Sequence, residues 1–275
     1  MKPRLLTHGV LLLGLAVMLY PVLWLVASSL RRGEDIFTSR GLWPDPATLD
    51  NYTTGWRGAG EVGFGRYLTN SLLVCAGAVV GNMIACSMAA YVFARLDFAF
   101  KKVLFAIMLA TIMLPHHVTL VPQYGLFRAL GWINTFLPLI VPKFLAVDAF
   151  FIFLMVQFIR SIPRELDEAA EVDGCGPIRI YWRVVLPLLT PALVTTAIFT
   201  FIWTYDDLFT QLIYLNDPAR ATVPIGLRTF LDATSSSNWG AMFAMSTVAL
   251  LPAVVVFTFF QRRLVEGIAA SGVKG

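Results

Sequence analysis

The sequence predicts an all-α polytopic membrane protein with six transmembrane helices. Three observations predict this class. Charged residues make up only 14% of the chain, whereas a soluble domain has about 25%. The mean hydropathy is +0.72, with 57% hydrophobic residues, and these residues gather in six segments, each near the length of about 20 residues that a bilayer requires. Charge this sparse cannot cover a soluble globule of 275 residues, so we expect one transmembrane domain over the whole chain.

The apolar segments place the expected spans in order along the chain. The first is too long for the apolar core of a signal peptide, which argues against cleavage. The second ends at Arg95, and the third contains Pro115, which is expected to kink it. The six expected spans cover about residues 5–30, 68–94, 103–121, 136–159, 191–215 and 239–260.

The distribution of positive charge predicts the orientation. An even number of spans puts both termini on one side, and twelve of the 21 basic residues fall on that side. The positive-inside rule therefore predicts two cytoplasmic termini, although Arg31 and Arg32 oppose it. The net charge of +4 is small and scattered, which argues against a nucleic-acid partner.

A polar segment, residues 161–187, separates the fourth and fifth expected spans. It begins with the signals of a short helix, because Pro163 suits the first helical position and Gly174 suits the C-terminal cap. Glu165 and Asp167 would lie near the positive end of the helix dipole. A stripe with helical spacing is formed by Leu166, Ala169, Ala170 and Asp173. Such a helix either rests at the membrane interface or, through its small alanines, lets another surface approach closely.

The spacing within this segment carries a resemblance. Glu168-Ala169-Ala170 is followed after three residues by Gly174, and Val184, Leu186 and Pro187 follow at further fixed intervals. This pattern resembles the EAA loop of ATP-binding-cassette importer permeases, with Val184 where isoleucine is usual. From about Tyr20 onward the chain is similar to permeases of the carbohydrate-uptake family, and most similar to the maltose-type second permease subunit. The similar positions elsewhere are Asn70-Ser71, Ala89-Ala90-Tyr91, Ala94-Arg95, Pro115, Val118-Thr119-Leu120, Pro122, Pro163-Arg164-Glu165-Leu166, Gln261-Arg262-Arg263, Val265-Glu266-Gly267 and Gly272-Val273-Lys274-Gly275.

The resemblance implies a function and a set of partners. It implies the type I importer permease fold in a prokaryotic inner membrane, where the EAA segment forms a coupling helix that docks on a cytoplasmic ATPase. The expected partners are a homologous second permease, two ATPase subunits, an extracytoplasmic substrate-binding protein and membrane lipid. Because the chain has no phosphate-binding loop, we expect no cofactor on it, no catalysis by it, and ATP with Mg²⁺ on the partner.

The resemblance also assigns the residues of this coupling site. They are Glu168, Ala169, Ala170, Asp173, Gly174, Leu186 and Pro187. Lys274, in the C-terminal tail, is either a further ATPase contact or part of a solvated end.

Ionisable side chains within the expected spans are candidates for the solute pathway, because charge at membrane depth is costly. Asp206 and Asp207 are adjacent in the fifth expected span, after Tyr205. Neighbours on a helix project about 100° apart, so both would not meet one ligand. Asp206 either tunes the pathway toward a polar or cationic solute such as an amino sugar, makes a structural hydrogen bond, or is solvated. His117 follows Pro115, and proline-broken helices often line cavities.

Other interpretations remain open at the level of the sequence. Asp148 either pairs with Lys143, pairs with another subunit, or is locally solvated. The adjacent histidines, His116 and His117, cannot share a metal ion on a helix, so no metal site is expected. The alternative function is a secondary transporter that works without an ATPase, which requires an inverted repeat and a charged relay. The solute is a sugar, an amino sugar, a polyol or a glycerophosphodiester.

Overall fold

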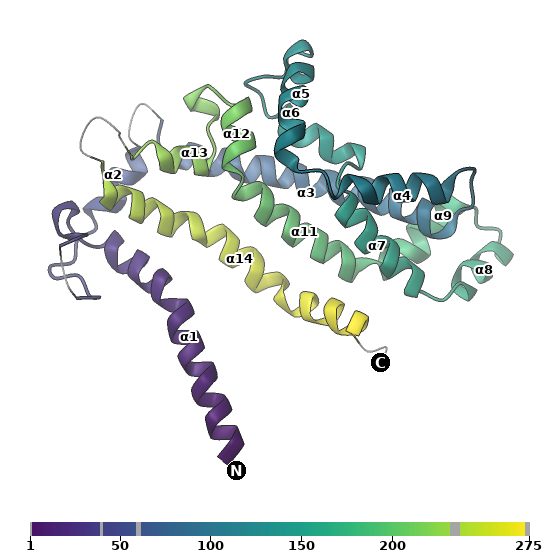
Figure 1. Cartoon of the computed structure of the whole chain (residues 1–275), viewed down its shortest axis with the longest axis horizontal. Helices are drawn as coiled ribbons and strands as arrows, with labels where there is room; N and C mark the ends of the chain where they lie inside the picture. Colours follow the sequence, from purple (N-terminus) through teal and green to yellow (C-terminus); the bar gives the residue numbers. More distant parts are fainter. Residues whose placement is uncertain (1, 39–40, 59–61, 232–236, 273–275) are drawn as a thin grey trace. The chain divides into compact units, whose positions relative to one another are not determined.

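The computed structural model describes residues 2–38, 41–58, 62–231 and 237–272, and this part of the chain is helical without strands. The chain divides into two compact units. One unit comprises Met1–Thr69 with Ala221–Ala253, and the other comprises Asn70–Arg220 with Val254–Gly275. Figure 1 labels the helices in chain order. The tail that contains Lys274 lies outside the described residues.

The first unit joins the first helix to the start of the last one. Its helical elements are α1 (Lys2–Ser29), a 3₁₀ turn (Gly33–Asp35), α2 (Asp50–Arg57), the start of α3 (Phe64–Arg95), α13 (Val223–Arg228) and the first part of α14 (Trp239–Gly272). The end of α1 is bonded to α2 through the Asn51 amide, which donates to the carbonyls of Ser29 (2.8 Å) and Arg31 (2.6 Å). Trp24 packs edge-on against Phe243 with ring centroids 5.3 Å apart. Most apolar side chains of α1 remain exposed, as expected of a helix that faces lipid or a partner.

The second unit contains the main buried core. Its elements are the rest of α3, α4 (Lys101–Thr111), α5 (His116–Ala129), α6 (Leu137–Ile140), a 3₁₀ segment (Val141–Leu145), α7 (Ala149–Ser161), α8 (Glu165–Val172), α9 (Pro177–Ile180), a π-helical turn (Tyr181–Val185), α10 (Leu186–Leu188), α11 (Thr190–Tyr205), α12 (Leu208–Tyr214), a 3₁₀ turn (Pro218–Arg220) and the rest of α14. The core is formed by apolar residues of α3, α7 and the 180–193 stretch, among them Ala90, Met155 and Leu189. Close packing of these faces against one another holds the three segments together.

Four helical stretches are long and apolar enough to cross a membrane: Leu6–Ser29, Phe64–Arg95, Leu137–Ser161 and Trp239–Gln261. A fifth is obtained if Pro177–Leu188 and Thr190–Tyr205, which are bent by 74° at their junction, count as one span. The described residues thus bear out a polytopic all-α membrane protein, whereas the predicted number of six spans is not confirmed.

The third expected span, 103–121, is not one helix. Helix α4 ends at Thr111, three residues in turns follow, and Pro115 is the N-cap of α5. Proline has no N–H to continue the hydrogen bonds of α4, and it disfavours helical geometry at the preceding residue. No helix ends at residue 121, because α5 continues through Pro122 to Ala129.

The fifth expected span, 191–215, also has different bounds. Helix α11 begins at Thr190 and ends at Tyr205, and a separate helix, α12, begins at Leu208. The two aspartates therefore lie in a break between helices and not within one helix. The fourth expected span is irregular in its first half, where Ala146 has the left-handed φ of 54° between the 3₁₀ segment and α7.

Two glycines of α3 allow the 137–145 segment to pack closely. Gly77 and Gly81 are four residues apart and form a GxxxG pattern, which is typical of close contacts between transmembrane helices. A Cβ at Gly77 would lie 2.9 Å from a carbon of Ile140, and a Cβ at Gly81 would lie 2.7 Å from the Phe144 ring. It would also lie 3.0 Å from the backbone carbonyl carbon of Lys143, which cannot rotate away.

We therefore expect Gly81→Ala to destabilise the protein by about 1–3 kcal/mol, because the added methyl overpacks a backbone contact. Thermal unfolding of the detergent-solubilised chain measures the effect. Gly125→Ala in α5 is the matched control, because a Cβ there meets nothing within 4 Å. Equal unfolding temperatures for the two variants would contradict the close packing.

Candidate functional site

A polar stripe at the end of α3 holds the 161–187 segment. Ser87, Tyr91 and Arg95 are spaced four residues apart and so lie on one face of the helix. The Ser87 hydroxyl lies 2.8 Å from the Tyr181 hydroxyl, and the Tyr91 hydroxyl donates to the Pro177 carbonyl at 3.0 Å. These bonds attach the part of the segment that follows α8 to α3.

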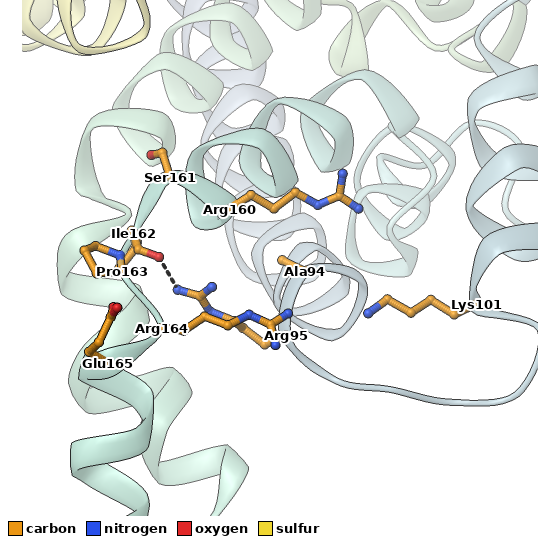
Figure 2. A pocket seen from close by; sticks show the side chains of 9 residues that line it. All are labelled: Ala94, Arg95, Lys101, Arg160, Ser161, Ile162, Pro163, Arg164 and Glu165. Atoms are coloured by element: carbon orange, nitrogen blue, oxygen red, sulfur yellow. Dashed lines mark hydrogen bonds between the residues drawn. The ribbon is translucent and has the colours of Figure 1, made fainter. Parts of the chain in front are cut away.

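Arg95 holds the part of the segment that leads into α8. Its guanidinium donates to the Ile162 carbonyl at 2.8 Å, as Figure 2 shows, and its Nε lies 2.6 Å from a carboxylate oxygen of Asp167. Only 6% of the Arg95 side chain and 13% of the Asp167 side chain are exposed. A buried charge is costly unless it is paired, so the pair fixes α8 against the end of α3.

Helix α8 spans Glu165–Val172, with Arg164 as its N-cap. Pro163 lies before the helix, so its predicted place as the first helical residue is wrong. The carbonyl of Arg164 accepts from the N–H groups of Asp167 and Glu168 in the first turn. Glu165, Asp167 and Glu168 place negative charge at the positive end of the helix dipole.

The C-terminal end of α8 is a Schellman motif. The Gly174 N–H donates to the Glu171 carbonyl and the Cys175 N–H donates to the Ala170 carbonyl, both at 2.9 Å. Gly174 has φ of +78°, and a Cβ there would meet nothing within 4 Å. Glycine is thus favoured by the left-handed backbone and not by lack of space.

The predicted coupling residues in and directly after α8 lie close together, but they differ in how far they are exposed. Glu168, Ala169, Asp173 and Gly174 are exposed, whereas Ala170 is half-buried against the main core. Leu186 packs on the same core from α10, and Pro187 is exposed. Because Pro187 lacks an N–H, the Arg183 carbonyl has no α-helical partner, and the helix is π-helical over Tyr181–Val185.

The pathway candidates lie at helix ends. Tyr205 is buried at the end of α11 and stacks on Phe201 with centroids 5.4 Å apart. Asp206 follows as an exposed C-cap. Asp207 is the N-cap of α12, and its carboxylate accepts from the Thr210 N–H at 3.0 Å. The side chain of His117 lies outside the described residues.

A buried polar network not recognised in the sequence surrounds Asp148. Its carboxylate accepts from Lys143 at 2.8 Å and from the Asn82 amide at 2.6 Å. The Asn82 amide also donates to the Thr200 hydroxyl at 3.0 Å. Asp148 therefore pairs with Lys143, one of the three alternatives above. The signal available in the sequence was an asparagine, Asn82, within an apolar run, since a polar side chain at membrane depth needs a partner.

Comparisons with known proteins agree with this architecture. Residues 81–269 match the family model described as binding-protein-dependent transport system inner membrane component. A probable ABC transporter permease of Bacillus subtilis, YurM, is 34% identical over 96% of this chain and 87% of its own length. The diacetylchitobiose uptake system permease DasC of Streptomyces coelicolor is 30% identical over 98% and 95% of the two chains.

A solved structure shares the fold. A chain of a bacterial ABC transporter that imports the acidic polysaccharide alginate superposes with a TM-score of 0.83, at 21% identity, over 95% of this chain and 96% of that one. The chain thus has the fold of an importer permease, and it belongs to the family of inner membrane components of binding-protein-dependent ABC transport systems.

The Arg95–Asp167 pair generates a stability prediction. We expect Arg95→Gln to destabilise the protein by about 3–5 kcal/mol, because it leaves the Asp167 carboxylate buried without its counter-ion. The double substitution Arg95→Met with Asp167→Leu should recover most of this loss. Thermal unfolding of the wild type, Arg95→Met, Asp167→Leu and the double variant provides the double-mutant cycle, and Arg95→Gln is measured beside it.

Asp97→Asn is the control for this cycle, because it breaks the Lys101–Asp97 pair, in which the Asp97 side chain is 91% exposed. Its effect should stay below about 1 kcal/mol. A double variant no more stable than Arg95→Gln would show that the pair is not what stabilises the contact.

The Schellman motif generates a prediction about local stability. We expect Gly174→Ala to speed amide exchange in α8 by about 5- to 30-fold, the equivalent of the 1–2 kcal/mol that a left-handed L-residue costs. Hydrogen–deuterium exchange of the 165–175 peptide measures this. Gly176→Ala, at a negative φ of −78° and with nothing within 4 Å of its Cβ, should leave exchange unchanged.

Proposed function

We propose that this chain is the permease subunit of an ATP-driven importer of a sugar or sugar-like solute, and that α8 is the helix on which a cytoplasmic ATPase acts. The observation that carries the proposal is the geometry of α8. A short helix exposes Glu168 and Ala169, while Arg95 and the Schellman motif fix both of its ends.

Exposed apolar side chains support a protein partner at this place. Val172 is 89% exposed at the end of α8, and Ile178 is 77% exposed in α9. These residues stand among charged ones in the 161–187 segment, and a protein that docks there would bury them. The small side chain of Ala169 lets such a partner approach the helix closely.

The attachments of α8 support its role in transmitting motion. A force on the helix would pass through Arg95 to α3 and through Ala170 to the core formed with α7. Closure of the ATPase around ATP and Mg²⁺ would therefore move transmembrane helices together with α8. A loop without these contacts would deform instead.

Family membership supports the remaining assignments. The proposal includes a second permease, two ATPase subunits, an external binding protein, six spans and cytoplasmic termini. The diacetylchitobiose permease among the relatives supports a sugar-like solute. Asp206, exposed at the break after α11, is proposed to face the solute pathway beside Tyr205 and with His117 of α5, whereas Asp207 acts as a helix cap. The family does not favour a secondary transporter.

The docking face can be tested with the assembled transporter. We expect Ala169→Phe to reduce co-purification of the ATPase subunits and binding-protein-dependent uptake by at least 10-fold, because the bulky side chain blocks close approach. The permease itself should unfold at the wild-type temperature, since Ala169 is exposed.

Ala129→Phe, an equally bulky change at an exposed position of α5, is the control and should retain the ATPase. Retention of the ATPase by Ala169→Phe would contradict docking on this face. Uptake in liposomes by this chain alone, without ATP, would establish the secondary transporter instead.

A further inference from the structure

A pocket with basic walls lies beside α8 and is not part of its exposed face. It has a volume of about 560 Å³ and opens between the end of α3, the start of α4 and the link from α7 to α8 (Figure 2). The residues that line it are Ala94, Arg95, Lys101, Arg160, Ser161, Ile162, Pro163, Arg164 and Glu165. Four of these nine side chains are basic and one is acidic, so the pocket is suited to an anion.

The four basic side chains have different contacts. Arg95 is held by Asp167 and the Ile162 carbonyl. Lys101 donates to the Leu96 carbonyl at 2.7 Å and pairs with Asp97 at 3.2 Å. Both side chains add positive charge to the wall of the pocket. Some of their N–H donors, however, are already bonded to protein groups.

The other two basic side chains have no acidic partner within the described residues. Arg160 is the last basic residue of α7, and its guanidinium carbon lies 5.5 Å from the centre of the Phe105 ring. Arg164 is the exposed N-cap of α8. Neither forms an ion pair in the part of the chain that the structure describes. In Figure 2 the side chains of Arg160 and Lys101 extend into the space beside Ala94 from different sides.

The position of the pocket indicates the kind of anion. It lies where the long helix α3 and the α7 stretch both end, which is the level of lipid headgroups. Exposed apolar residues of α4 begin directly after Lys101 with Val103, Leu104 and Ile107, and a hydrocarbon chain can lie against them. Basic pockets between transmembrane helices on the cytoplasmic side are suited to phospholipid headgroups, and guanidinium groups bind phosphate oxygens through paired donors.

We propose that this pocket binds a phosphate-ester anion through Arg160 and Arg164. The anion comes either from the headgroup of an anionic phospholipid or from a free phosphate ester. Because Arg160 lies in the last turn of α7 and Arg164 is the N-cap of α8, one bound phosphate joins the two helices across Ile162 and Pro163. The site thus adds to the contacts of Arg95 a second attachment of α8, which depends on the anion.

The experiment compares wild type with Arg160→Gln/Arg164→Gln, purified as full chains. Each is reconstituted in nanodiscs of phosphatidylcholine with 20% phosphatidylglycerol, and the phosphatidylglycerol that stays bound on transfer to detergent is measured by native mass spectrometry. We expect the double variant to bind this lipid about 30-fold more weakly, since each basic residue contributes about 5-fold. Arg179→Gln/Arg183→Gln removes two exposed charges from the 161–187 segment outside the pocket and should bind as wild type does.

A second arm distinguishes the two sources of phosphate. The detergent-solubilised chain is titrated with glycerol 3-phosphate and with inorganic phosphate, and binding is followed by its effect on the unfolding temperature. A lipid site requires the phosphatidylglycerol signal without this shift. A site for a free ester shows the shift, and the shift disappears in Arg160→Gln/Arg164→Gln.

Three outcomes would overturn the proposal. The first is that wild type retains phosphatidylglycerol no better than phosphatidylcholine and responds to neither free anion. The second is equal loss of anion binding in both double variants, which would indicate general surface charge. The third is that Arg160→Gln/Arg164→Gln retains the anion but, in the assembled transporter, no longer co-purifies with the ATPase subunits, which would assign the pocket to a protein partner.

Discussion

The arrangement of the 161–187 segment depends on the end of α3. Three polar side chains on one face of this helix, Ser87, Tyr91 and Arg95, contact the segment both before and after α8. Arg95 constrains the segment most, because its buried charge is costly unless it stays beside the Asp167 carboxylate and the Ile162 carbonyl. A helix of eight residues would be marginal by itself. This attachment fixes α8 to a transmembrane helix, as the proposed coupling role requires.

The same need of polar groups for partners applies where the other helices are interrupted. Backbone groups cannot be left without partners in an apolar environment, so each break is accompanied by a local solution. Asp207 caps α12, and Pro115 is the N-cap of α5 at the point where α4 has ended. The Asp148 carboxylate is paired with Lys143 and accepts a hydrogen bond from the Asn82 amide. Asp207 and Asp148 therefore have structural partners beside these breaks, whereas Asp206 is exposed.

Much of α8 could be predicted from the sequence because its signals are local. Gly174 predicted the end of the helix, because glycine favours the left-handed backbone found there. Acidic residues predicted its first turn. The prediction for Pro163 was wrong by two residues, since Arg164 provides the cap. The role of Arg95 could not be predicted in this way, because its partner carbonyl at Ile162 is 67 residues away. Similarly, the acceptor of Asn82 at Asp148 is 66 residues away.

The sequence alone determined the class of protein, the helical character of its apolar segments and the residues of the EAA pattern, since these follow from composition and from short-range spacing. Tertiary structure decided which face of α8 is exposed and which basic residues share a pocket. The reason is that these features depend on contacts between helices. Periodicity along one helix shows that a side chain is apolar or charged, but only packing shows whether Arg95 is buried beside a carboxylate or Arg160 is open to an anion.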